Sequence, residues 1–104
     1  MERAALLRRI RSDLEAAYGS RLRLVVLYGS EARGEARPDS DIDVLVLLDE
    51  VADYGRELRR CIDALYPLAL ECERPISPTP VAIREYTTVD CPLYRRAHAE
   101  GIAA

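Results

Sequence analysis

The sequence predicts a mixed α/β domain with a small mixed sheet and flanking helices. Two observations support this fold class. Short apolar runs alternate along the chain with amphipathic segments at helical spacing, and Gly and Pro residues separate these segments. The chain has 104 residues, of which 49% are hydrophobic. This is the size of one domain with one core, and we expect residues 1–104 to form a single domain.

The first element is expected to be an amphipathic helix over residues 2–18. Its apolar positions recur at helical spacing: Leu6, Leu7, Ile10, Leu14 and Ala17. Gly19 is expected to end this helix, because glycine is common just past a helix C-terminus. The continuous apolar run in residues 22–28 then predicts a strand.

Gly29 and Ser30 interrupt this strand. Residues 31–34 are compatible with one short helical turn, and residues 35–40 are expected to form a loop. Residues 42–48 predict a second strand. This strand is apolar on both faces, which is typical of a central strand that is covered on both sides.

A second long helix is expected to begin near Asp53 and to end at Pro67. Residues 68–74 then predict a third strand. The following stretch "PISPTPV" contains three prolines. It has few backbone donors, so we expect an edge or a loop.

The tail, residues 83–102, predicts one or two short helices, with Pro92 at a helix start. The proline-rich residues 75–80 and the tail 86–102 could form a partner surface, because the tail carries Tyr and Arg, types that are enriched at protein interfaces. Alternatively, Tyr86 and Tyr94 cover a core that has no Phe and no Trp.

Composition limits the class of function. The net charge is −3, and no basic stripe with interleaved aromatic residues is present, so direct nucleic-acid binding is not expected. Cys61, Cys72 and Cys91 are an odd set without a CxxC pair. With a charged, helix-like N-terminus, they indicate reduced thiols in a cytoplasmic protein. No apolar run approaches the length of a membrane span.

Asp41 and Asp43 stand at the start of the second strand. Because strand side chains alternate, both are expected to point to one face, with Cβ atoms roughly 6–7 Å apart. Two carboxylates at that spacing raise each other's pKa, and a divalent cation such as Mg²⁺ would remove this penalty. The alternative is that both aspartates cap the loop and face water.

Gly29 and Ser30 follow the first strand. Gly permits close backbone approach, and the amides after it could form an anion cradle with the Ser hydroxyl; alternatively, the pair is an ordinary turn. A phosphate site and a metal site on adjacent strands would together form a nucleoside triphosphate site.

A third carboxylate would complete two-metal chemistry. Glu71 and Glu73 share a face of the predicted third strand, and periodicity does not choose between them. Arg33 could reach the triphosphate or the acceptor. Equally, it could pair on the surface with an acidic neighbour, Glu31, Glu35 or Asp39.

The stretch "GSEARGEARPDSDID", residues 29–43, resembles the signature of minimal nucleotidyltransferases (MNT) of the DNA polymerase β superfamily. In that signature Gly-Ser is followed by ten residues and then Asp-x-Asp, which is the spacing seen here. "ECERPISPTPV" and "CPLYRRAHAEGI" also resemble later segments of short, stand-alone members. The resemblance implies a polymerase β palm-like fold and maps the third acidic residue to Glu73.

The resemblance further implies a mechanism. Asp41 and Asp43 would hold Mg²⁺ on the triphosphate of ATP, Gly29 and Ser30 would bind the β- and γ-phosphates, and Glu73 would help to bind a second metal ion. An acceptor hydroxyl would then attack the α-phosphorus, and pyrophosphate would leave.

Members of this size resemble the antitoxin of HEPN–MNT modules, in which AMP is transferred to a tyrosine of the HEPN toxin. Three functions are therefore considered: AMP transfer to a HEPN partner, neutralisation of that partner by binding alone, and nucleotidyl transfer to a small molecule or an RNA end.

Overall fold

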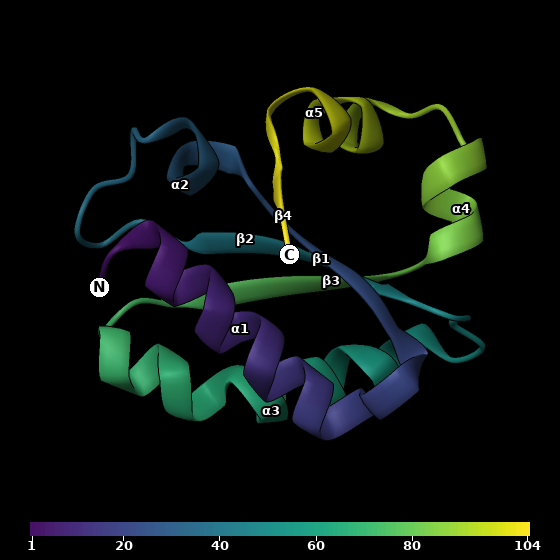
Figure 1. Ribbon diagram of the computed structural model, residues 1–104, viewed down its shortest axis with the longest axis horizontal. Helices are drawn as coiled ribbons and strands as arrows, with labels where there is room; N and C mark the ends of the chain where they lie inside the picture. Colours follow the sequence, from purple (N-terminus) through teal and green to yellow (C-terminus); the bar gives the residue numbers. More distant parts are fainter.

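The computed structural model describes residues 1–104 as a four-stranded mixed sheet between two layers of helices (Figure 1). The strand order is β3-β2-β1-β4, with bounds β1 Leu22–Tyr28, β2 Ile42–Leu48, β3 Ile76–Ala82 and β4 Ile102–Ala103. β1 is antiparallel to both β2 and β4, whereas β2 and β3 are parallel. The predicted fold class is confirmed.

Two long helices cover one face of the sheet, α1 (Arg3–Tyr18) and α3 (Tyr54–Cys72). Their buried side chains pack on alternate residues of β1 and β2, such as Val25 and Val44. Gly19, with a φ of +58°, ends α1 as expected and begins a short 3₁₀ turn, η1 (Gly19–Arg21).

Two shorter helices cover the opposite face, α4 (Ile83–Thr88) and α5 (Pro92–Glu100). Tyr86 and Tyr94 are 6% and 8% exposed and pack on the other alternate residues of the central strands. These tyrosines therefore belong to the core. Because both faces of β2 are covered, its continuous apolar sequence is explained.

The end of α3 corrects the prediction. The helix continues through Pro67 to Cys72, so residues 68–74 are not a strand. Leu68 is fully buried whereas Leu70 is 60% exposed, which is incompatible with a strand in which both would share a face. Pro67 removes one helical hydrogen bond, but it lies on the exposed side where water can replace it.

The third strand is instead the proline-rich stretch. β3 lies at an edge of the sheet, and the Pro75 carbonyl accepts a hydrogen bond from the Ile42 amide of β2 at 2.9 Å. Because backbone groups alternate sides along a strand, Pro78 and Pro80 direct their nitrogens away from β2. Only the open edge loses donors, so the two prolines within β3 are compatible with an edge strand, and Pro75 precedes the strand.

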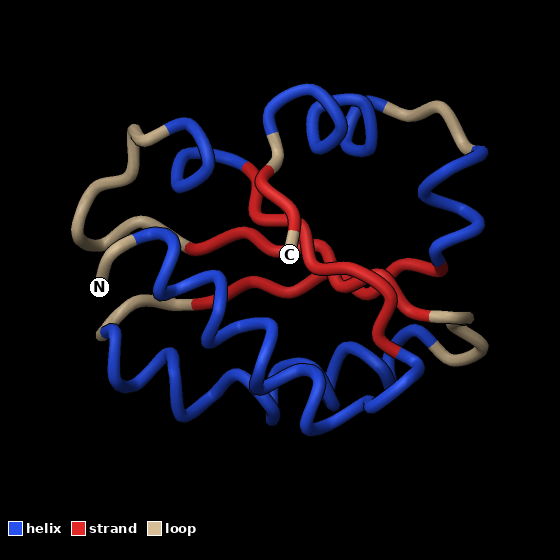
Figure 2. The backbone as a smooth tube through the Cα atoms, viewed as in Figure 1, coloured by secondary structure: helices blue, strands red, loops and turns tan.

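The remaining expectations concern short elements. The predicted turn is a short helix, α2 (Gly29–Arg33), and Pro92 begins α5. The strand β4 was not predicted. Figure 2 shows the loops before β2 and before β3 at the same end of the sheet. All three cysteines are free, and none of the helices has the length and apolarity needed to cross a membrane.

Candidate functional site

Asp41 and Asp43 lie where the chain enters β2. Asp41 is exposed and immediately precedes the strand, and Asp43 is half-buried within it. Asp43 pairs with Tyr28, the last residue of β1, and with Ser77 of β3. The aspartates therefore lie at the start of a strand that is paired with a neighbouring strand on each side.

The electrostatics of this pair are unfavourable in the protein alone. Burial raises the pKa of the Asp43 carboxyl, and the nearby charge of Asp41 raises this pKa further. Neither aspartate takes part in any of the ion pairs of the molecule. Two adjacent carboxylates without a cationic partner suit a divalent cation, which would compensate both charges.

Gly29 packs directly against Asp43. Its φ is +74°, and a Cβ atom at this position would lie 2.6 Å from Asp43 Oδ2. Glycine is therefore favoured here by the left-handed backbone, and the absence of a Cβ leaves room for the Asp43 carboxylate in its observed position. The Gly-Ser motif and the Asp-x-Asp motif, which are separate in sequence, adjoin in space.

Ser30 lies in the first turn of α2. No side chain caps this helix, so the amides at its start are not used by the protein's own side chains. The Ser30 carbonyl accepts a hydrogen bond from the Glu35 amide at 2.9 Å, and Gly34 ends the helix with a φ of +73°. This closes the turn that follows the Gly-Ser pair.

The structure does not bring a third carboxylate to the aspartates. Glu71 lies on α3 and pairs with Arg9 at 2.8 Å, and Glu73 ends α3 in a left-handed conformation with φ 56°. No three His, Cys, Asp or Glu side chains form a group that could hold a metal ion. On β3, the positions beside Asp43 and Leu45 are Ser77 and Thr79.

Arg33 pairs with acidic side chains on the surface of the protein. Its guanidinium donates to Glu35 at 3.3 Å and to Glu100 at 3.2 Å. These partners raise the pKa of Arg33. In this arrangement Arg33 fastens α2 to the end of α5.

Residues that sequence reasoning missed also adjoin the site. Burial raises the pKa of the Tyr28 hydroxyl, and both the Thr79 hydroxyl and the charge of Arg96 act against this rise. Arg74 contacts Glu31 and the Ser40 carbonyl. Tyr28 immediately precedes the Gly-Ser motif, so its place beside the site could have been predicted from the sequence. Arg74 and Arg96 are remote from both motifs in sequence, so their positions could not.

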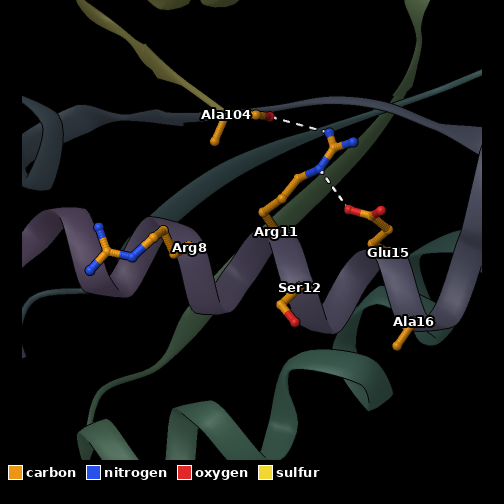
Figure 3. Close-up of a pocket in the computed structure, with 6 residues that line it drawn as sticks. All are labelled: Arg8, Arg11, Ser12, Glu15, Ala16 and Ala104. Atoms are coloured by element: carbon orange, nitrogen blue, oxygen red, sulfur yellow. Dashed lines mark hydrogen bonds and ion pairs between the residues drawn. The ribbon is translucent and has the colours of Figure 1, made fainter.

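A hollow beside α1 is lined by other residues. It has a volume of about 470 Å³ and is lined by Arg8, Arg11, Ser12, Glu15, Ala16 and Ala104 (Figure 3). Arg11 is occupied by Glu15 at 3.2 Å and by the Ala104 carbonyl at 3.3 Å. None of the sequence-predicted site residues lines this hollow.

Comparison with known proteins defines the class. The nucleotidyltransferase domain family matches residues 7–102, and the chain belongs to this family. It is 31% identical over 78 residues to the Methanocaldococcus jannaschii protein named "Putative protein adenylyltransferase MJ0141", covering 75% of this chain and 78% of that protein.

Two solved structures share the fold. One is a toxin–antitoxin crystal structure with AMP-PNP, at a TM-score of 0.69 and 20% identity over 92% of this chain and 69% of that chain. The other is tri-AMPylated Shewanella oneidensis HEPN toxin in complex with MNT antitoxin, at a TM-score of 0.56 and 18% identity over 98% and 71%. The protein is a nucleotidyltransferase with a minimal nucleotidyltransferase fold.

Proposed function

We propose that this protein is the antitoxin of a toxin–antitoxin pair and transfers AMP from Mg-ATP to a tyrosine hydroxyl of a HEPN toxin. One observation carries the proposal: Asp41 and Asp43 form an uncompensated carboxylate pair, and Asp43 packs on the glycine of a Gly-Ser turn. The names of the M. jannaschii relative and of the S. oneidensis complex support the activity and the partner.

Asp41 and Asp43 would hold Mg²⁺, and their chemistry fits this ion. Magnesium sites commonly use one or two carboxylates, with substrate phosphates and water completing the octahedron. Two carboxylates are what this site offers. A bound Mg²⁺ supplies charge neutralisation for the triphosphate and its leaving group.

The remaining steps concern the chain's own residues. Gly29 has no side chain, so its backbone lies close to the Asp43 carboxylate. Ser30 and the amides that follow it would bind the terminal phosphates. The rigid β2 fixes Asp43 between two neighbouring strands, so positioning is the main contribution of the protein. In the proposed reaction, the acceptor oxygen would bond to the α-phosphorus, the bond to pyrophosphate would break, and the phenol proton would pass to solvent water.

A second candidate function is neutralisation of the toxin by binding alone. It is favoured by one observation, the lack of a third carboxylate beside the aspartates: Ser77 and Thr79 are the β3 neighbours on that side of the site. With no carboxylate there to accept the proton of the acceptor, transfer would depend on the intrinsic acidity of the acceptor hydroxyl.

Titration calorimetry tests the site. We expect Mg-ATP to bind the wild type and to bind the Asp41→Ala/Asp43→Ala variant at least tenfold more weakly. Asp39→Ala is a matched control, because Asp39 is an exposed carboxylate in the same loop. Equal affinity of wild type and double variant would contradict the proposed metal site.

A further inference from the structure

We propose that Arg74 is a positioning residue that fastens the Gly29-Ser30 turn to the backbone that leads into Asp41. This inference rests on the proposed function and deepens it by naming a residue on which the geometry of that site depends. Arg74 lies in the connection between α3 and β3, outside both motifs.

Arg74 first contacts the phosphate side of the site. Its Nη1 donates to Glu31 Oε1 at 3.3 Å, and its Nη2 donates to Glu31 Oε2 at 3.2 Å. Glu31 immediately follows Ser30 in the first turn of α2. A two-pronged contact of this kind fixes the carboxylate in orientation as well as in distance, so α2 is held against the α3–β3 connection.

Arg74 also contacts the metal side of the site. Its Nε donates to the Ser40 carbonyl at 2.9 Å. The next residue, Pro75, accepts a hydrogen bond from the Ile42 amide at 2.9 Å. The residues on both sides of Asp41 are therefore bound to two successive residues of the α3–β3 connection. Asp41 is itself exposed and precedes the strand, so these contacts join its backbone to the rest of the fold, whereas the bonds between Ser40 and Arg37 lie within the loop.

Burial of both members distinguishes this ion pair from the others. The side chains of Arg74 and Glu31 are 14% and 10% exposed, whereas those of the Arg9–Glu71 pair are 44% and 54% exposed. Exposed pairs contribute little to stability, whereas removal of one member of a buried pair leaves an uncompensated charge. Here that charge would belong to Glu31, beside the proposed phosphate site. Arg is suited to both tasks, because its fork reaches two carboxylate oxygens and a carbonyl at once.

A purely structural role and a positioning role predict different results. If Arg74 only neutralises Glu31 within the fold, removing both charges should restore stability and nucleotide affinity together. If Arg74 positions the site, removing both charges should restore stability but not affinity, because the contact to the Ser40 carbonyl and the fork to Glu31 are still lost.

The test compares Arg74→Met, Arg74→Lys, Glu31→Gln/Arg74→Met and the matched surface variant Arg9→Met. Three properties are measured: the melting temperature and, below the melting transition, the Kd for Mg-ATP and amide hydrogen exchange in residues 30–42. We expect Arg74→Met to weaken Mg-ATP binding at least tenfold and to accelerate exchange. Glu31→Gln/Arg74→Met should recover the melting temperature but not the affinity, and Arg9→Met should match the wild type.

The other outcomes are also decisive. Recovery of affinity together with melting temperature in the double variant, or unchanged affinity in Arg74→Met, would overturn the inference. If Arg74→Met does not fold, Arg74→Lys, which keeps the charge without the fork, takes its place in the comparison. If the wild type itself fails to bind Mg-ATP, the proposed function fails, and hydrogen exchange alone decides: unchanged exchange in residues 30–42 overturns the inference, and accelerated exchange supports it.

Discussion

Gly29 offers a test in which stability and binding should separate. Alanine at this position must adopt a φ of +74°, and its Cβ would lie 2.6 Å from Asp43 Oδ2. Gly34 provides a matched control. Its φ is +73°, and the nearest atom to an added Cβ is Arg3 Nη1 at 4.0 Å.

The two substitutions should have similar effects on stability. A left-handed conformation costs a residue with a Cβ atom about 1–2 kcal/mol. In a domain of this size that corresponds to a fall in Tm of roughly 4–16 °C. The contact with Asp43 adds little to this cost, because a carboxylate at the end of a side chain can rotate away. The Cγ and Cβ atoms of Asp43 are at 3.5 and 3.6 Å, which are ordinary contact distances.

Their effects on binding should differ. Rotation of the Asp43 carboxylate disturbs one of two proposed ligands, so Gly29→Ala should weaken Mg-ATP binding by roughly tenfold to a hundredfold, as changes around metal ligands commonly do. Gly34→Ala should retain nearly the affinity of the wild type. Thermal denaturation followed by circular dichroism gives Tm, and titration calorimetry gives the affinity. Equal losses of affinity in the two variants would refute the reasoning from the Gly29–Asp43 contact.

Two further predictions concern the charges of the site. Asp43→Asn should raise Tm near pH 7 in the absence of metal, because burial and Asp41 raise the pKa of Asp43 and make its ionised form destabilising in the folded state. This gain in Tm should shrink as the pH falls toward the ordinary pKa of 3.8, because the wild-type carboxyl then also becomes protonated. Thermal denaturation of both proteins across this pH range measures the gain, and a gain that grows as the pH falls would contradict the prediction. Ser77→Asp places a third carboxylate beside Asp43. It should lower the Tm measured without metal and tighten Mn²⁺ binding measured by calorimetry. Unchanged Mn²⁺ affinity would show that Ser77 does not face the site.

The central part of the fold was predictable because its signals are local. The periods of the first helix and of the first two strands are regular, and Gly19 ends α1 as expected. The boundary between α3 and β3 was not predictable in this way. Pro67 is tolerated on the exposed side of a helix whose other side is buried, and prolines are tolerated in β3 because the sheet leaves that edge open.

The same boundary explains the misplaced third carboxylate. Glu71 and Glu73 were candidates because a strand was predicted over residues 68–74, and the resemblance then selected Glu73. The structure has helix there, and β3 begins later, with Ser77 beside Asp43. By contrast, the approach of Gly29 to Asp43 agrees with the motif spacing, because both residues lie at the ends of adjacent, antiparallel strands. The contacts of Arg74 depend on tertiary structure, since they join residues that are 34 and 43 positions apart.

The most direct test of the proposed function is the intact mass of the partner. The protein is co-expressed with the product of its neighbouring reading frame, beside an Asp41→Ala/Asp43→Ala control. We predict that the partner gains mass in whole AMP units with the wild type only, and that the added mass maps to a tyrosine. A stable complex in which the partner gains no mass with either protein would contradict AMP transfer and favour neutralisation by binding.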